Sequence, residues 1–157
     1  MLDTKLFYRN VEDIVGSLLL VSDGEFLIEI RFDNDKKIKN SDIPILIETE
    51  KQLRQYFVGE RQIFSIPLKP FGTNFQLSVW NELKKISFGK TISYQQLAER
   101  VGDKNKSRAV GNANGKNPIP IIIPCHRVIH KSGELGGFGG GIQIKRKLLE
   151  LEQKFMK

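Results

Sequence analysis

The sequence contains one cysteine, Cys125, and the residue that follows it is His126. A thiolate is a strong nucleophile, and histidine is the side chain best suited to accept a thiol proton near neutral pH. Neighbours in an extended strand point to opposite faces, so we expect this proton to pass either directly or through a bridging water. A lone cysteine is also often an inert core residue, and that alternative stays open at this point.

The segment before this pair is apolar and rigid. It contains three prolines and runs Asn117-Pro118-Ile119-Pro120-Ile121-Ile122-Ile123-Pro124. Each proline fixes one backbone dihedral angle and so limits the conformations of the segment. Such a segment is expected to hold Cys125 in a defined position, which favours a functional thiol over an inert one.

Glu152 lies on the apolar stripe of a predicted C-terminal helix. The stripe consists of Ile144, Leu148, Leu151 and Phe155, and the outward positions are Gln143, Arg146, Lys147, Glu150 and Lys154. A buried carboxylate needs a partner, and His126 and Arg127 are the candidates. If Glu152 holds the imidazole, it fixes the tautomer and stabilises an imidazolium, so that His126 can deprotonate Cys125. A salt bridge to an arginine is the alternative.

A helix-turn-helix pattern precedes the proline-rich segment. Ser93 and Gln96 have the spacing of a capping box and begin a short helix that ends at Gly102. A second short helix is predicted over residues 106–114, with its inward positions at Ala109, Val110 and Ala113. Many helical hairpins of this kind never touch DNA, so the pattern alone does not establish DNA binding.

The second of these helices is slim, and Arg108 is its one long basic side chain. Its small residues are Ala109, Gly111, Ala113 and Gly115. Readers of the major groove carry several long polar side chains, whereas a slim helix can approach the backbone across a minor groove about 6 Å wide. Arg108 could then enter the base stack or bind phosphate. A plain surface arginine is the alternative.

The first half of the sequence predicts a small α/β unit with a structural role. Its expected elements are a strand at 18–21, a strand at 26–30, a charged loop at 33–37, a helix at 46–57 that ends before Gly59, and a strand at 63–66. Asp23-Gly24, between the first two strands, is a strong hairpin signal. Prolines and a glycine at 67–72 mark a boundary, which divides the chain into domains 1–70 and 71–157. A helix over about residues 74–86 opens the second domain.

Charge differs between the two halves. The net charge of the chain is +7; residues 1–72 contain 10 Lys and Arg against 12 Asp and Glu, and residues 73–157 contain 15 against 6. A basic second half favours a polyanionic partner there, although an excess of lysine can also be solvated surface alone.

Several classes of protein are excluded by the sequence. No apolar stretch approaches the length of a membrane span, and residues 1–5 lack the layout of a secretion signal. A single cysteine excludes an intrachain disulfide and a multi-cysteine zinc site. We therefore expect a soluble cytoplasmic protein with no membrane partner.

These residues together resemble a known family, the O6-alkylguanine-DNA alkyltransferases. The resemblance runs through roughly residues 72–155. It rests on Ile123-Pro124-Cys125-His126-Arg127-Val128, Arg108-Ala109-Val110-Gly111, Gly115-Lys116-Asn117-Pro118 and Ile92-Ser93-Tyr94-Gln95-Gln96-Leu97. The first half resembles the family only in its pattern of strands, hairpin and helix.

The resemblance implies an α/β N-terminal domain with ribonuclease H-like strands plus a helix, followed by a mostly α helix-turn-helix domain that binds DNA and catalyses. It implies DNA repair by a suicide methyltransferase, in which an alkyl group of O6-alkylguanine, or of O4-alkylthymine, passes irreversibly to Cys125 after the nucleotide is flipped out of the duplex. The expected partner is double-stranded DNA bearing alkylated guanine, contacted from the minor groove by a monomer. No cofactor and no metal are implied.

The resemblance also implies roles for individual residues. Cys125 accepts the alkyl group, His126 and Glu152 activate it, and Asn117 braces the turn. Tyr94 helps to rotate the nucleotide and donates a hydrogen bond to the guanine ring. The expected contacts to DNA and to the flipped base are Arg108 in the vacated stack, Gln95 and Lys131 on DNA, the backbone of Cys125 and Val128 on the guanine edge, and Phe138 and Gly139 at the pocket wall.

The glycine-rich run at 133–141, which includes Gly139, allows close approach of a flat ligand and room for alkyl groups larger than methyl, although it also fits an idle loop. Two other functions stay open at this stage. One is a module that binds lesions without repairing them, and the other is a Cys-His hydrolase that forms an acyl-enzyme. The hydrolase would leave the basic helical hairpin unexplained.

Overall fold

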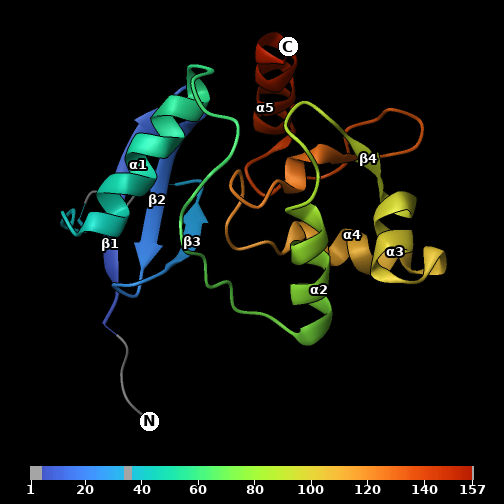
Figure 1. Ribbon diagram of the computed structural model, residues 1–157, viewed down its shortest axis with the longest axis horizontal. Coiled ribbons are helices and arrows are strands. Elements are labelled where there is room, and N and C mark those ends of the chain that lie inside the picture. The colour runs from blue at the N-terminus through green and yellow to red at the C-terminus, as the bar shows by residue number, and fades with distance from the viewer. Residues whose placement is uncertain (1–4, 34–36, 157) are drawn as a thin grey trace. The chain divides into compact units, whose positions relative to one another are not determined.

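The computed structural model describes residues 5–33 and 37–156 and divides into two compact units, one ending at Phe71 and the other beginning at Gly72 (Figure 1). The sequence had placed this boundary one residue earlier. Most of the charged loop expected at 33–37, and most of the start at residues 1–5, lies outside the described residues. In the described ranges no helix is both long and apolar enough to cross a membrane.

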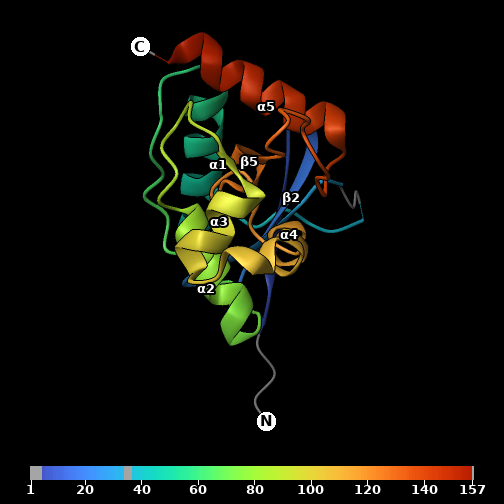
Figure 2. The same cartoon turned by 90° about the vertical axis from the view of Figure 1, so that its right-hand side faces the viewer.

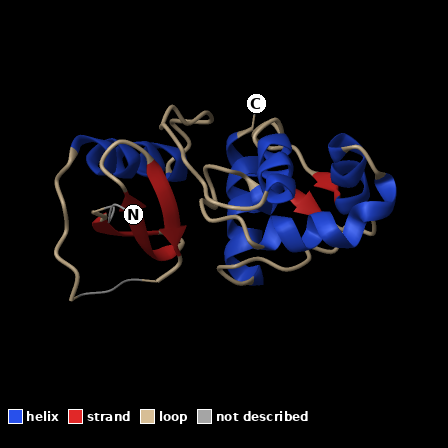
Figure 3. Cartoon of the chain, turned by 90° about the horizontal axis from the view of Figure 1, so that it is seen from below, coloured by secondary structure: helices blue, strands red, loops and turns tan. Residues whose placement is uncertain are grey.

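The first unit is a three-stranded antiparallel sheet with one helix on its face (Figure 3). The strands are β1 (Phe7–Asp13), β2 (Gly16–Ser22) and β3 (Leu27–Arg31), and β2 lies in the centre. The hairpin predicted around Asp23-Gly24 is confirmed, with Gly24 at a φ of 107°. β1 was missed because it is an edge strand whose residues are mostly half-exposed and polar.

Helix α1 (Pro44–Phe57) confirms the helix predicted at 46–57, and Gly59 follows it at a φ of 81°. The strand predicted at 63–66 is wrong. The Gln52 side chain accepts a hydrogen bond from the Ser65 backbone nitrogen at 2.9 Å, so a side chain occupies the group that a neighbouring strand would need. Among the described residues, the ladder contact nearest to this segment is an isolated bridge between Leu27 and Leu68.

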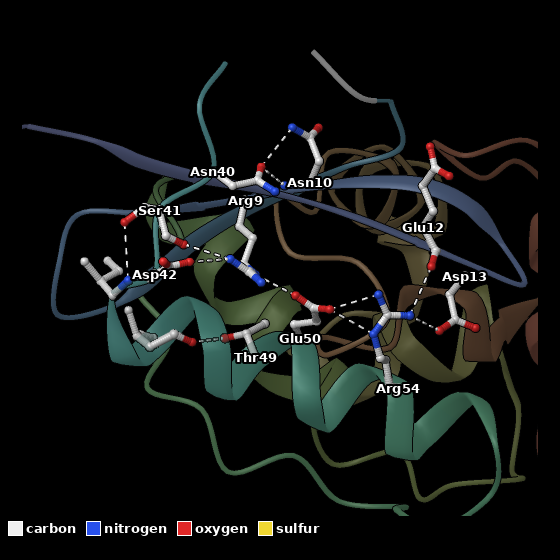
Figure 4. Close-up of polar contacts among 12 residues, drawn as sticks. Arg9, Asn10, Glu12, Asp13, Asn40, Ser41, Asp42, Thr49, Glu50 and Arg54 are labelled. Carbon is white, nitrogen blue, oxygen red and sulfur yellow. Dashed lines mark hydrogen bonds and ion pairs between the residues drawn. The ribbon is translucent and has the colours of Figure 1, made fainter. Parts of the chain in front are cut away.

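A network of ion pairs joins α1 to β1 (Figure 4). Glu50 accepts hydrogen bonds from Arg9 Nε at 2.5 Å and from Arg54 Nε at 2.9 Å. The two guanidiniums also reach Asp42 at 3.0 Å and Asp13 at 2.9 Å, respectively. This network fastens the helix to the sheet.

The second unit is mostly helical, with one short parallel pair of strands (Figure 3). In chain order its elements are α2 (Asn74–Leu83), β4 (Ile92–Ser93), α3 (Tyr94–Val101), a 3-10 turn η1 (Lys104–Lys106), α4 (Ser107–Gly115), a 3-10 turn η2 (Cys125–Arg127), β5 (Val128–Ile129) and α5 (Ile142–Phe155). The helix predicted to reach residue 86 ends at Leu83, because the chain continues as a turn in which Ile86 N bonds Leu83 O at 3.0 Å.

The helix-turn-helix is confirmed as α3 and α4, which pack against each other (Figure 2). Ser93 and Gln96 form the expected capping box, and Gly102 ends α3 at a φ of 117°. One inward position was wrong: Ala109 is exposed, and Asn114 is buried beside Val110 and Ala113. The buried face follows the i, i+3, i+4 spacing from Val110, which leaves Ala109 to one side.

Candidate active site

The proline-rich segment ends in a tight turn that carries the cysteine. Asn117 Nδ2 donates to Ile123 O at 2.7 Å, and Cys125 N bonds the same carbonyl at 2.8 Å. Ile121 is buried with a φ of 74°, a left-handed conformation that β-branched residues rarely adopt. The backbone at Cys125 is a 3-10 turn and not the extended strand assumed from the sequence. Asn117 thus braces the turn from within it.

Glu152 holds both of the groups that the sequence offered as alternatives (Figure 2 shows the helix α5 that carries it). Its Oε2 lies 2.6 Å from His126 Nε2, and Arg127 donates from Nε to Oε1 at 2.8 Å and from Nη2 to Oε2 at 3.0 Å. The Gly89 backbone nitrogen adds a further bond to Oε1 at 3.0 Å. The carboxylate therefore fixes the imidazole and is itself fixed by Arg127.

This arrangement sets the charges of the site. Burial would raise the pKa of Glu152, but hydrogen bonds from His126 and Arg127, together with the charge of the Arg127 guanidinium, outweigh burial and hold that pKa far below its ordinary value. Burial lowers the pKa of His126 despite the adjoining carboxylate, so the imidazole is neutral at pH 7. A neutral imidazole that bonds Glu152 through Nε2–H has its lone pair on Nδ1. Within residues 5–33 and 37–156 that buried Nδ1 has no hydrogen-bond partner.

Cys125 is a free thiol in an enclosed site, 5% exposed. Burial raises the pKa of the thiol to about 11, and a hydrogen bond from Asn117 and the charge of Lys145 only partly offset this. Desolvation disfavours the thiolate, and this is why the pKa is raised.

Lys145 is a site residue that the sequence analysis missed. It is fully buried, and its Nζ donates to Val128 O at 2.7 Å and lies 3.4 Å from Gly137 O. Burial lowers the pKa of Lys145 to about 8, and the thiol of Cys125 raises it in part. The signal in the sequence was its spacing, because Lys145 precedes Leu148 and Glu152 by one and two helical turns on the same face.

Tyr94 begins α3 and lies within electrostatic reach of Cys125. Burial and then the charge of Cys125 raise the pKa of its phenol. Its ring packs against His130, with centroids 5.0 Å apart, and passes close to Gly111 of α4, where a Cβ would lie 3.6 Å from Cδ1. Arg108 is exposed one turn before Gly111 on the same helix. The structure thus brings Tyr94 and α4 together beside the thiol.

The remaining predicted residues lie around this centre. Gln95 and Lys131 are exposed and line one hollow of about 420 Å³, together with Thr91, Ser93 and His130. Phe138 and Gly139 follow Gly137 in the glycine-rich loop, and the Gly137 carbonyl lies 3.4 Å from the Lys145 ammonium. The carbonyls of Cys125 and Val128, expected at the guanine edge, already accept from Asn114 Nδ2 at 3.3 Å and from Lys145.

The described residues contain no group of His, Cys, Asp and Glu side chains that could hold a metal ion. The residues around Cys125 can perform nucleophilic chemistry. A buried thiol is followed directly by a neutral imidazole, one nitrogen of which is unpaired in the described chain, and a buried carboxylate holds the other nitrogen. The phenol of Tyr94 begins the helix-turn-helix. This combination defines a DNA-binding protein with a reactive cysteine.

Comparison with known families agrees with that class. Residues 74–154 match the 6-O-methylguanine DNA methyltransferase, DNA binding domain, and residues 6–70 match the ribonuclease-like domain of the same methyltransferase. The two matches span most of the chain, which therefore belongs to the 6-O-methylguanine DNA methyltransferase family. The fold expected from the sequence, a ribonuclease-like α/β domain followed by a helical DNA-binding domain, is confirmed.

Individual relatives are similar over nearly the whole chain. The chain is 44% identical to a methylated-DNA--protein-cysteine methyltransferase of Haemophilus influenzae, covering 96% of this chain and 88% of the relative. It is 43% identical to the protein of the same name from Methanosarcina acetivorans, covering 94% and 98%. A crystal structure of the Mycobacterium tuberculosis protein OGT in complex with DNA matches with a TM-score of 0.87 at 42% identity, covering 95% of this chain and 94% of that one.

Proposed function

We propose that this protein repairs DNA by transferring an alkyl group from O6-alkylguanine to Cys125 Sγ, once per molecule. The observation that carries the proposal is the state of His126. His126 directly follows Cys125, and its Nε2 is bound to Glu152. Its buried Nδ1 is unpaired in the described chain. The names of the relatives, methylated-DNA--protein-cysteine methyltransferases, support the same chemistry.

In the resting protein the thiol keeps its proton, because burial raises its pKa to about 11. Transfer therefore begins when His126 Nδ1 takes that proton, directly or through a water. Glu152, held by Arg127, stabilises the imidazolium that results. The barrier to deprotonation protects the thiol until a substrate is in place.

The sulfur then attacks the alkyl carbon, so the S–C bond forms as the O6–C bond breaks. The electron pair of that bond leaves with the guanine, and the Tyr94 hydroxyl donates a hydrogen bond to the ring as negative charge develops there. Solvent returns a proton to the base and takes one from the imidazolium. The net change is a guanine in the DNA and a thioether on Cys125, and no group in the site can cleave a thioether.

Binding to DNA is assigned to the second unit. α3 and α4 form the helix-turn-helix, and the slim α4 suits the minor groove, with Arg108 filling the place that the flipped nucleotide leaves. Gln95 and Lys131 would contact the backbone from their shared hollow. Asn117 braces the turn, and Phe138 and Gly139 would wall the pocket, where Gly139 leaves room for groups larger than methyl.

The protein is further proposed to act as a cytoplasmic monomer without a cofactor. Repair of O4-alkylthymine by the same site is a secondary expectation.

Peptide mass spectrometry tests the reaction directly. After incubation with duplex DNA carrying O6-methylguanine, the peptide that contains Cys125 should gain one methyl group, with one methyl lost from the DNA per protein. Cys125→Ala should bind the same DNA and remove nothing. A protein that binds the lesion without forming the adduct would be a recognition module instead, and repeated turnover on small esters would point to a hydrolase.

Arg108→Ala separates flipping from general binding. The rate of transfer should fall more than the affinity for undamaged duplex, because phosphate contacts made elsewhere remain. An equal loss of both would contradict the role given to Arg108. Salt should weaken binding to any sequence, since phosphate contacts release counterions.

A further inference from the structure

The ring of Tyr94 is held from several sides. A Cβ on Gly111 of α4 would lie 3.6 Å from the ring, and a Cβ on Gly136 of the glycine-rich loop would lie 2.5 Å from the hydroxyl oxygen. These two neighbours are glycines and offer only backbone. Two side chains also lie on the ring. The Lys145 ammonium is 5.9 Å from the ring centroid, and the centroid of the His130 imidazole is 5.0 Å from it at an interplanar angle of 48°. His130 is thus the aromatic partner of the phenol.

The pairing of β4 with β5 places His130 beside Tyr94. The two strands are parallel, and Ser93 at the end of β4 lies opposite Ile129 at the end of β5. Tyr94 and His130 are the next residues on the two sides, so they continue this register. Side chains at matching positions of paired strands point to the same face. The contact between the two rings is therefore a consequence of the strand register.

A tight turn fixes the backbone of His130 from the other direction. Its N–H donates to the Glu134 carbonyl at 2.8 Å, and its own carbonyl accepts from the Gly133 N–H at 2.9 Å. A Cβ on Gly136 would also lie 3.3 Å from His130 Nε2, so the backbone that adjoins the phenol adjoins the imidazole as well. His130 is exposed, yet β5 before it and this turn after it set its position.

We propose that His130 is a positioning residue for alkyl transfer, because its ring holds the Tyr94 phenol in the orientation from which the hydroxyl donates to the departing guanine. The inference rests on the function proposed above and gives a role to a residue that the mechanism does not use. The contact that matters is between two flat rings, so it does not require the imidazole nitrogens. A donor displaced by about 1 Å loses much of its effect on the rate, and a phenol without this partner can move by that much.

Single-turnover transfer from a duplex with O6-methylguanine tests this role in His130→Ala and His130→Phe. His130→Ala removes the ring, so the maximal rate of transfer should fall about tenfold. The protein concentration that gives half of the maximal rate should change less than about twofold, because the residue acts on the phenol and not on DNA binding. His130→Phe keeps a flat ring, and its rate should be within about twofold of that of the unaltered protein.

A second comparison shows whether His130 acts through Tyr94. Tyr94→Phe removes the hydroxyl that has to be positioned, so adding His130→Ala to it should slow transfer by no more than about twofold. Ser132→Ala is the matched control, since Ser132 is exposed in the same turn and its substitution should leave the rate unchanged. Thermal unfolding shows whether each variant is folded. His130→Ser, which also lacks a ring, replaces His130→Ala if that variant does not fold.

Three results would overturn the proposal. One is a rate of transfer in His130→Ala equal to that of the unaltered protein. Another is slow transfer in folded His130→Phe, which would mean that the imidazole nitrogens act themselves, for instance on a phosphate. The third is a further loss of about tenfold when His130→Ala is added to Tyr94→Phe. Failure of the proposed function is a different result, in which the unaltered protein forms no methyl adduct on Cys125, and it would remove the basis of this inference as well.

Discussion

Each unit of the molecule contains a glutamate held between two cationic or potentially cationic side chains, and the two clusters differ in burial. Glu50 lies between Arg9 and Arg54 with its side chain 19% exposed, and Glu152 lies between His126 and Arg127 with its side chain 1% exposed (Figure 4 shows the first). In both, burial would raise the carboxyl pKa and hydrogen bonds from the partners lower it.

The difference lies in the partner that can change its charge. Both partners of Glu50 are guanidiniums, which stay protonated, so that cluster can only hold α1 on β1. One partner of Glu152 is an imidazole that burial keeps neutral, with one nitrogen unpaired in the described chain. In the first unit the glutamate therefore holds a helix on a sheet. In the second unit the glutamate holds an imidazole that can accept a proton, next in sequence to the thiol.

Replacing each glutamate by glutamine tests this comparison and should give the largest effect. Glu152→Gln leaves a buried guanidinium without its counter-charge and an imidazolium without support, so transfer should fall about a thousandfold and stability by about 3–5 kcal/mol. Glu50→Gln should leave the rate of transfer unchanged. Single-turnover kinetics and urea unfolding measure the two quantities. If Glu50→Gln slowed transfer as much as Glu152→Gln, the distinction between the clusters would be lost.

The buried thiol should react with small alkylating agents in a steeply pH-dependent way. Its pKa lies at about 11, raised from its ordinary value by burial, so the thiolate fraction and the rate of reaction with iodoacetamide should rise about tenfold per pH unit from pH 7 to pH 10. Transfer from alkylated DNA should instead stay level from pH 7 to about pH 8, because His126, whose pKa is lowered, is already a free base and Lys145, with a pKa of about 8, has not yet lost its charge. Iodoacetamide rates that level off by pH 8 would show a thiolate stored in the free protein.

Two glycines with positive φ, one in each unit, form a matched pair. Gly136 has a φ of 76°, and a Cβ there would lie 2.5 Å from the Tyr94 hydroxyl; Gly16 has a φ of 89° with open space around it. Gly136→Ala should displace the phenol and slow transfer about tenfold, whereas Gly16→Ala should cost only about 1–2 kcal/mol of backbone strain. Equal rates of transfer in the two variants would show that the position of Tyr94 does not matter.

Many of these elements and site residues could be predicted from the sequence. The helices α1, α3 and α5 and the hairpin were predicted because each has one apolar face and a clear cap or turn. Cys125, His126 and Glu152 were predicted as one site, and the choice between histidine and arginine as the partner of Glu152 was left open because one carboxylate can bond both.

The features that the sequence did not provide depend on long-range contacts. The strand at 63–66 was wrong because Gln52, distant in sequence, bonds the Ser65 backbone. Lys145 and Asn114 were missed because the sequence does not show whether a polar residue near the inward face of a helix is buried. Their burial became clear only from their partners, Val128 O and Cys125 O. The raised thiol pKa could not be foreseen because burial, and not residue type, sets it.

The smallest expected effect concerns the exposed cluster alone. A double-mutant cycle on Arg9→Ala and Glu50→Ala should give a coupling free energy of about 1 kcal/mol, because these side chains are partly solvated and each has a second partner. The coupling should weaken in 1 M salt, where charges are screened over about 3 Å. Urea unfolding of the four proteins at low and high salt measures both values. A coupling of several kcal/mol that salt leaves unchanged would mean that Glu50 behaves as a buried charge like Glu152, and that burial does not separate the two clusters.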